Sequence, residues 1–196
     1  MEWLTLLDGR PVGRAVRQAL GPGAAELHPG SELLPAILER IDEVGSRVVL
    51  VGGSDDLRRA WSIVLAADYP GVRDGGTRRV DWSWLDQPGS GAELARWVAD
   101  RDADVVVICL GKPRQEVWMR DHGRASNAGL LLAFGSAADY VAGTARRPPR
   151  WARRHGLEWA VRLAREPRRL WRRYLLEGPR SWLLLARRGI DVDVRS

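Results

Sequence analysis

Residues 47–54 read Arg47-Val48-Val49-Leu50-Val51-Gly52-Gly53-Ser54, a short apolar run that ends in two glycines. Similar runs at residues 104–110 and 130–134 are followed by Gly111 and Gly135. Continuous apolar content, rather than alternation with polar residues, is typical of a parallel strand covered on both faces. The three runs therefore predict buried strands that each pass into a helix at a glycine.

Helix signals fill the intervals between these runs. Ser54, Asp55 and Asp56 predict a capped helix that continues to about Asp68. Alternation of strand and helix in this order is typical of βαβ units with right-handed crossovers. The predicted fold class is therefore α/β, with a Rossmann-like, mostly parallel sheet flanked by helices.

Two further helix starts are predicted downstream, and one interval lacks a clear pattern. Residues 90–93 have the form of a capping box, and Pro113 is expected just inside the start of the next helix. Residues 71–89 are rich in glycine and polar residues, so they are interpreted as a loop. Within that loop, residues 80–84 have at most the pattern of a short edge strand.

The cysteine, histidine and hydropathy patterns exclude several classes of protein. The single cysteine, Cys109, lies inside an apolar run and is expected to be a buried packing residue. The three histidines have no partner at a metal-ligand spacing, so we expect no metal cofactor. No apolar run approaches the ~20 residues of a spanning helix, and no export signal is evident. A cytoplasmic protein is therefore expected.

Positive charge is concentrated at the C-terminal end. The whole chain of 196 residues carries a formal charge of +6, but residues 146–188 contain fourteen arginines and three acidic residues, a local excess of +11. Helical segments are predicted there at residues 151–165, 167–176 and 179–188. Such a basic, amphipathic segment favours a polyanionic partner such as lipid headgroups, a diphosphate or nucleic acid.

Two glycine turns are candidates for phosphate binding. Gly52-Gly53-Ser54 and Gly111-Lys112-Pro113 each follow a predicted strand, where ligands of α/β sheets bind. Each turn by itself also fits an ordinary strand-to-helix connection. Neither turn has the Gly-x-Gly-x-x-Gly pattern, and no Walker-type Gly-Lys-Ser/Thr occurs, which disfavours classical dinucleotide and ATP sites.

Several segments in the C-terminal half resemble one family. Residues 110–116 read Leu110-Gly111-Lys112-Pro113-Arg114-Gln115-Glu116, similar to the Gly-x-Pro-Lys-Gln-Glu signature of the WecG/TagA/CpsF glycosyltransferases. Residues 139–143 and 146–151 resemble that family's Ala-Gly and Arg-Ala-Pro-x-Trp segments. Asp8-Gly9 resembles the Asp-Gly segment that holds the family's proposed catalytic base.

The resemblance implies inverting transfer of an N-acetylated hexosamine-type sugar from a UDP-sugar to a polyprenyl-diphosphate-linked sugar, without a required metal or other cofactor. It implies Asp8 as general base and Gln115 as a second catalytic residue that holds sugar hydroxyls. The predicted substrate-binding residues are Gly52 and Gly53 of the first glycine turn, together with Gly111, Lys112, Glu116, Arg146, Arg147 and Arg150.

The resemblance also suggests how the chain is organised. Residues 1–145 are expected to form the nucleotide-sugar-binding core, and residues 146–190 a basic helical appendage that associates with an anionic membrane surface. Peripheral attachment to the inner face of the plasma membrane follows from this expectation, and a homo-oligomer is compatible with it. No nucleic-acid partner is expected.

Two alternatives remain open at this point. Members of the family usually have a longer segment before the Asp-Gly pair, so one alternative is a truncated, inactive member that binds nucleotide or partners. The other is a nucleic-acid-binding module that uses the basic end, although no helix-turn-helix or RNA-binding signature is present. Salt-sensitive binding to random oligonucleotides, without binding to anionic vesicles, would favour the second alternative.

Overall fold

The computed structural model describes residues 30–155, 157–165, 167 and 171. Residues 30–146 belong to one compact unit, and the described residues from Arg147 onward belong to a second. The predicted division into a nucleotide-sugar-binding core and a membrane-associating appendage stays a prediction. The two units are described separately below.

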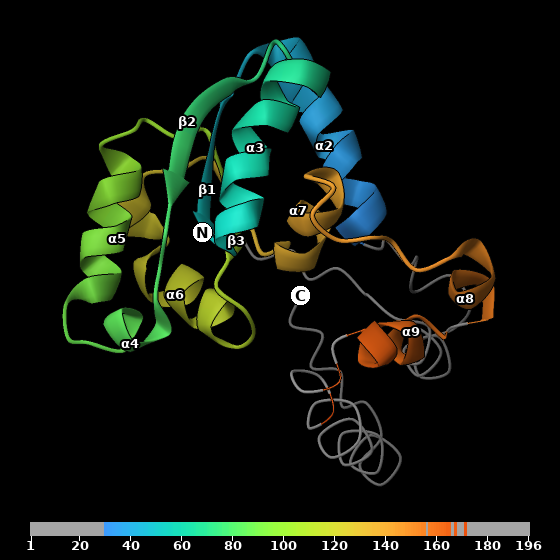
Figure 1. Ribbon diagram of the computed structural model, residues 1–196. Helices are drawn as coiled ribbons and strands as arrows, with labels where there is room; N and C mark the ends of the chain where they lie inside the picture. Colours follow the sequence, from blue (N-terminus) through green and yellow to red (C-terminus); the bar gives the residue numbers. More distant parts are fainter. Residues whose placement is uncertain (1–29, 156, 166, 168–170, 172–196) are drawn as a thin grey trace, which may run out of the picture. The chain divides into compact units, whose positions relative to one another are not determined.

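A parallel sheet with the strand order β2-β1-β3-β4 forms the centre of residues 30–146 (Figure 1). Its strands are β1 (Arg47–Gly52), β2 (Arg73–Arg78), β3 (Val105–Cys109) and β4 (Leu130–Leu132). The central strands pair in register, from Val48 opposite Val105 to Gly52 opposite Cys109. The predicted α/β class and the three strands predicted from apolar runs are confirmed.

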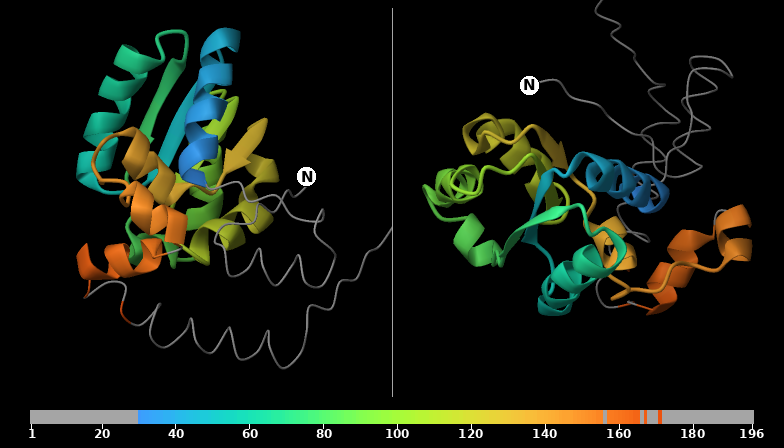
Figure 2. Two further views of the ribbon diagram at one scale, coloured as in Figure 1. Left: turned by 90° about the vertical axis from the view of Figure 1, so that its right-hand side faces the viewer. Right: turned by 90° about the horizontal axis from the view of Figure 1, so that it is seen from above.

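Helices cover both faces of this sheet (Figures 1 and 2). One face is covered by α2 (Gly30–Val44), α3 (Asp55–Asp68) and α7 (Gly135–Val141). The other is covered by α4 (Trp82–Leu85), α5 (Ser90–Ala99) and α6 (Arg114–His122). The result is a helix–sheet–helix sandwich with a hydrophobic core on each side of the sheet.

Strand β1 shows why its sequence is apolar without interruption. Val48 and Leu50 pack into the core beneath α2 and α3, whereas Val49 and Val51 pack into the core beneath α5 and α6. All four are fully buried. Because successive side chains of a strand point to opposite faces, burial of both faces requires apolar residues at every position.

The predicted start and end of α3 are confirmed. The Ser54 hydroxyl accepts a hydrogen bond from the Leu57 amide at 3.1 Å, as an N-cap residue does. Asp55 and Asp56 occupy the first turn, where a carboxylate interacts favourably with the positive end of the helix dipole. The helix ends at Asp68, and Tyr69 is its C-cap.

Two predicted helix starts differ in detail from the structure. Gly89, with φ of +84°, is the N-cap of α5, and the Ser90 hydroxyl instead donates to the carbonyls of Leu85 and Gln87, both at 2.7 Å. The capping box is therefore wrong, because that hydroxyl is bonded to the preceding turn. Pro113 is the N-cap of α6 rather than its first residue, and it follows a cis peptide bond.

The loop predicted for residues 71–89 is wrong in two places. Residues 73–78 form the edge strand β2, which pairs with β1 around a bulge, and residues 82–85 form α4 where a short edge strand was considered. A Cβ on Gly75 would lie 2.6 Å from a methyl carbon of Val49, so the glycine allows close pairing. Backbone pairing at a sheet edge does not require apolar side chains. Strand β2 therefore lacks the apolar pattern from which the other strands were predicted.

The second unit contains α8 (Arg150–His155) and α9 (Glu158–Arg165). They replace the single helix that was predicted over residues 151–165, and Gly156, a poor helix former, lies between them in the sequence. Most of the helical segments predicted at 167–176 and 179–188 lies outside the described residues. In the part of the chain that the structure describes, no helix is both long and apolar enough to span a bilayer.

Candidate functional site

The strand order places a topological switch point between β1 and β3. The chain leaves β1 through α3 on one face of the sheet and leaves β3 through α6 on the other. Neighbouring strands whose following helices lie on opposite faces form a topological switch point, and α/β sheets bind ligands beyond the carboxyl ends of such strands. The predicted turns at Gly52 and Gly111 both lie at this edge.

The turn after β1 requires glycine at two positions. Gly52 and Gly53 have φ of +81° and +76°, values that other residues rarely adopt. The Gly53 amide donates to the Cys109 carbonyl at 3.1 Å, and a Cβ on Gly52 would lie only 2.7 Å from the same oxygen. The two turns therefore meet backbone to backbone, with no room for a side chain between them.

Residues 109–115 are the meeting point of all four connections that leave the described sheet. The β1 connection reaches Cys109 through Gly53, and the β2 connection reaches the Leu110 carbonyl through the Trp82 indole N–H at 3.1 Å. The β4 connection approaches from the other side, since the Gln115 side chain donates to the Ala133 carbonyl at 3.4 Å. One short segment thus organises the whole carboxyl edge.

Gln115 is buried at this edge with its amide orientation fixed. The residue is 3% exposed, and its Nε2 donates to Glu116 Oε1 at 3.0 Å as well as to the Ala133 carbonyl. Because the nitrogen points to these two acceptors, the amide oxygen is the atom that remains to accept a hydrogen bond from a ligand hydroxyl.

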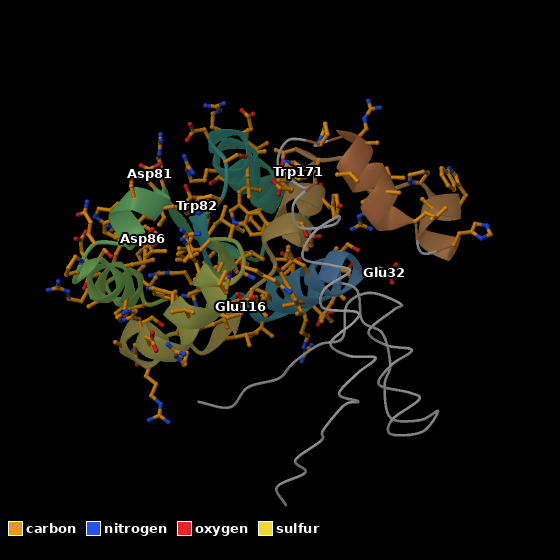
Figure 3. All side chains as sticks on the ribbon, turned by 90° about the horizontal axis from the view of Figure 1, so that it is seen from below. Glu32, Asp81, Trp82, Asp86, Glu116 and Trp171 are labelled. Atoms are coloured by element: carbon orange, nitrogen blue, oxygen red, sulfur yellow. The ribbon has the colours of Figure 1, made fainter. Side chains whose placement is uncertain are left out.

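Glu116 has one carboxylate oxygen in an unusual environment. Oε1 accepts from Gln115, whereas Oε2 is buried and has no hydrogen-bond partner among the residues that the structure describes. Figure 3 shows Glu116 on α6 at the carboxyl edge, seen end-on to the strands. An unpaired buried oxygen is costly in a folded protein and occurs at ligand-binding and catalytic sites.

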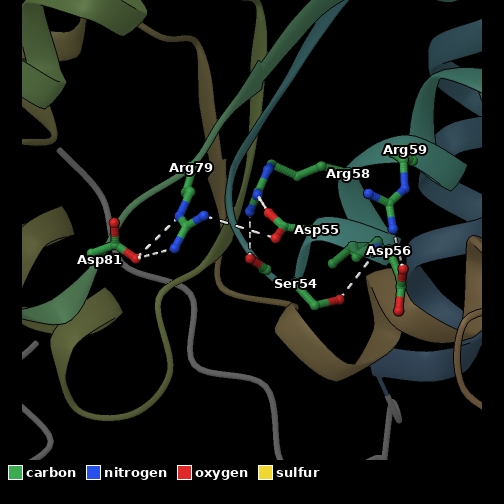
Figure 4. A network of polar contacts seen from close by, with 9 residues as sticks. Ser54, Asp55, Asp56, Arg58, Arg59, Arg79 and Asp81 are labelled. Atoms are coloured by element: carbon green, nitrogen blue, oxygen red, sulfur yellow. Dashed lines mark hydrogen bonds and ion pairs between the residues drawn. The ribbon is translucent and has the colours of Figure 1, made fainter.

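A polar network braces the turn after β1 (Figure 4). Arg58 donates from Nη1 to the Gly53 carbonyl at 2.7 Å and forms an ion pair with Asp55. Arg79 binds Asp81 at 3.0 Å and lies 3.8 Å from Asp55. Burial, and then the positive charge of Arg79, lower the pKa of Arg58. The turn therefore has two guanidinium groups beside it.

The turn after β3 carries two further cations. Lys112 is exposed, and Arg114 is half-buried at the start of α6. The Arg114 guanidinium lies 4.8 Å from the centre of the Trp82 ring and 3.4 Å from an Asp86 oxygen. Cationic side chains therefore lie beside both turns: Arg58, Arg79 and Arg114 are each paired with a carboxylate, whereas Lys112 is exposed.

Cys109 has no role as a nucleophile at this edge. Its Sγ lies 3.9 Å from the Gly135 carbonyl, and its side chain packs against the core beneath α7. Burial, and then the negative charge of Asp139, raise the pKa of the thiol, so the thiolate is not populated at neutral pH. This agrees with the packing role that was predicted for it.

Six of the ten predicted site residues lie together in the structure. The six lie in the two turns and the first turn of α6: Gly52, Gly53, Gly111, Lys112, Gln115 and Glu116. Asp8 lies outside the described residues. Arg146 and Arg147 are exposed and belong to different units, and Arg150 begins α8 with a side chain that is not described. Their roles stay predictions.

Four residues at this edge were not among the sequence-based candidates: Arg58, Trp82, Arg114 and Asp139. Arg114 lies within the segment 110–116, and Asp139 lies within the segment 139–143, so both motifs already contained them. Arg58 follows the Gly-Gly turn by one helical turn, which is a usable signal. No sequence signal identified Trp82, because its segment was interpreted as a loop or a short edge strand.

A comparison with known protein families agrees with this geometry. Residues 1–193 match the family described as "Glycosyl transferase WecG/TagA/CpsF family", so the match covers nearly the whole chain. This family implies a nucleotide-sugar donor and a lipid-linked acceptor in general. The chain therefore belongs to the WecG/TagA/CpsF family of glycosyltransferases.

Proposed function

We propose that this protein is an inverting hexosyltransferase that moves an N-acetylated hexosamine-type sugar from a UDP-sugar to a polyprenyl-diphosphate-linked acceptor. The product would enter synthesis of a cell-surface polysaccharide or teichoic acid. The observation that carries the proposal is the convergence of the Gly52-Gly53 turn, the Gly111 turn and the buried Gln115 amide at one edge, in a chain of this family. A diphosphate with a sugar on one side fits that arrangement.

Each part of this carboxyl edge has a role in the proposed reaction. The turns at Gly52 and Gly111 allow the backbone to approach the donor diphosphate, and Lys112 contributes positive charge. The Gln115 amide oxygen accepts a hydrogen bond from a sugar hydroxyl, and Glu116 holds that amide in place. Asp8 removes the proton of the acceptor hydroxyl as it attacks the anomeric carbon.

Charge on the leaving UDP is offset by cations of the protein in this proposal. Arg146, Arg147 and Arg150 are the candidates to neutralise the diphosphate, so no metal ion is required. Residues 146–190 hold the protein on the anionic inner face of the plasma membrane, where the lipid-linked acceptor is found. A homo-oligomer is compatible with this arrangement.

The direct test uses the full chain, a polyprenyl-diphosphate-linked acceptor sugar and a panel of UDP-sugars. We expect release of UDP and a disaccharide-lipid product of inverted anomeric configuration with at least one UDP-N-acetylhexosamine. Product is identified by mass spectrometry and the anomer by NMR. If no UDP-sugar in the panel binds to or reacts with the protein, the proposed function is wrong.

Removal of divalent metal is expected to leave the rate unchanged. In the same assay, excess EDTA should alter the transfer rate by less than about twofold, because arginine and lysine side chains supply the positive charge that a metal would otherwise supply. The control is a Mg²⁺ titration after EDTA treatment. A rate that falls on chelation and returns with Mg²⁺ would contradict the metal-free reaction.

Glu116→Gln is expected to lower kcat/KM by about tenfold with little change in thermal stability. The new amide can present either its nitrogen or its oxygen to Gln115, so the Gln115 amide is no longer held in one orientation, and misplacement of a positioning group lowers the rate. Glu39→Gln, an exposed position on α2, is the matched control. Unchanged kcat/KM in Glu116→Gln would remove this positioning role.

A further inference from the structure

Two charge pairs of the same kind begin α3, but only one of them is buried. Residues 55–59 read Asp-Asp-Leu-Arg-Arg, so each arginine follows an aspartate by three positions. Arg58 forms an ion pair with Asp55, and Arg59 forms one with Asp56 (Figure 4). The Arg58 side chain is 12% exposed, whereas that of Arg59 is 72% exposed. An exposed pair contributes little to stability, and a buried charge is costly unless its partners are well placed. The burial of Arg58 therefore needs a further explanation.

The second partner of Arg58 supplies that explanation. Its Nη1 donates to the Gly53 carbonyl at 2.7 Å, while the N–H of the same glycine donates to the Cys109 carbonyl at 3.1 Å. Gly53 has φ of +76°, and a glycine restricts the rotation of its neighbouring peptide planes less than any other residue. The backbone alone therefore does not fix these planes. Arg58 holds one side of Gly53 and Cys109 holds the other.

The orientation of the Gly53 carbonyl decides where the next amide points. In a trans peptide the carbonyl and the following N–H point in opposite directions, so the Ser54 N–H points away from Arg58. Among the residues that the structure describes, the Ser54 amide has no acceptor. A backbone N–H is a strong donor that requires a partner, and phosphate oxygens are suitable partners at the start of a helix. Without Arg58, the Gly53–Ser54 peptide could rotate and misdirect this amide.

We infer that Arg58 is a positioning residue for sugar transfer, which fixes the Gly53–Ser54 peptide so that the Ser54 amide meets the diphosphate of the donor. The inference rests on the proposed function, since it takes the donor to carry a diphosphate at this turn. Arg58 acts through the backbone, because its Nη1 is bonded to Gly53 and its Nη2 to Asp55. Asp55 in turn keeps the guanidinium in place.

The arginine pair provides the first test, in which titration calorimetry measures binding of inorganic diphosphate and of UDP to the full chain. Arg58→Met should raise both Kd values by about tenfold, as expected when one hydrogen bond to a charged group is weakened. Arg59→Met makes the same change of charge one residue away and should stay within about twofold of the native Kd. Arg58→Lys keeps a cationic donor and should recover part of the loss.

The transfer assay separates positioning from damage to the fold. In Arg58→Met the KM for the UDP-sugar should rise, whereas the KM for the lipid-linked acceptor should stay at its native value. Damage to the fold would alter both constants. An equal rise in both would therefore overturn the positioning role.

The aspartate pair provides a test in which charge and positioning predict opposite signs. Asp55→Asn and Asp56→Asn each remove one negative charge from the first turn of α3, and by charge alone either change strengthens binding of an anion. Positioning predicts that Asp55→Asn raises the Kd for diphosphate by about threefold, because Arg58 loses its ion-pair partner. Asp56→Asn should not raise it. This comparison decides the question if Arg58→Met does not fold.

The outcomes distinguish this inference from the proposed function. Equal Kd values for diphosphate in Arg58→Met and Arg59→Met would overturn the positioning role and leave the proposed function intact. Tighter binding by Asp55→Asn would also overturn it, because the guanidinium would then act by its charge rather than through the turn. Failure of the native chain to bind both diphosphate and UDP would overturn both proposals.

Discussion

Asp8→Asn is expected to reduce the rate of sugar transfer by about 10²- to 10⁴-fold, the usual contribution of a general base. The acceptor hydroxyl must lose its proton as it attacks the anomeric carbon, and asparagine has nearly the shape of aspartate but cannot take up that proton. Donor binding should change little, because Asp8 acts on the acceptor. The rate at saturating donor and the Kd for UDP are the two measurements.

Matched variants separate chemistry from folding in this test. Asp68→Asn alters an exposed carboxylate at the end of α3 and should transfer sugar at the native rate. Asp8→Glu keeps the carboxylate but moves it, so it should retain more activity than Asp8→Asn. Equal rates for Asp8→Asn and the native chain would remove Asp8 from the role of base, and loss of UDP binding together with rate would assign it a structural role instead.

Gly52→Ala should lower the free energy of unfolding by about 2–5 kcal/mol and abolish UDP binding at micromolar concentrations. Two costs add here: about 1–2 kcal/mol for the strain of a Cβ at positive φ, and about 1–3 kcal/mol for the clash of that Cβ with neighbouring backbone. The Cβ would lie 2.7 Å from the Cys109 carbonyl oxygen, so relief of the clash would push the β1 and β3 turns apart. Urea unfolding and calorimetry measure the two effects.

Gly89→Ala is the control that isolates the clash. Gly89 has φ of +84°, close to the +81° of Gly52, but a Cβ there would meet nothing within 4 Å. It should therefore cost only about 1–2 kcal/mol of stability and leave UDP binding unchanged. If Gly52→Ala and Gly89→Ala were equally stable and bound UDP equally well, close contact between the two turns would not be needed for the site.

The strands and one helix of this fold were predictable because their signals are local. A strand buried on both faces needs apolar residues at successive positions, and residues 48–51 meet that requirement. The cap of α3 was equally local, since Ser54 bonds a backbone amide three residues away. Strand β2 was not predicted because its pairing uses backbone groups and glycines. Helix α4 was not predicted because its apolar side chains cover the edge of a core that is built from distant residues.

Much of the candidate site was predictable as a set of residues, but not as an arrangement. Gly52, Gly111 and Gln115 were identified from strand ends and from the family resemblance. Trp82 was not, because its position depends on a hydrogen bond to Leu110, which is 28 residues away in the chain. The orientation of the Gln115 amide likewise depends on the Ala133 carbonyl, 18 residues away.

The sequence by itself determined the α/β class, the buried strands and the glycine turns, because each depends on side-chain hydrophobicity or backbone freedom over a few neighbouring residues. Only the tertiary structure decided that four connections meet at residues 109–115, that Gln115 is buried there and that Trp82 stands exposed beside Gly111. These features come from sheet pairing, which joins β1 to β3 across more than fifty residues of chain. Which turns become neighbours is therefore set by strand order, and no short segment of sequence encodes it.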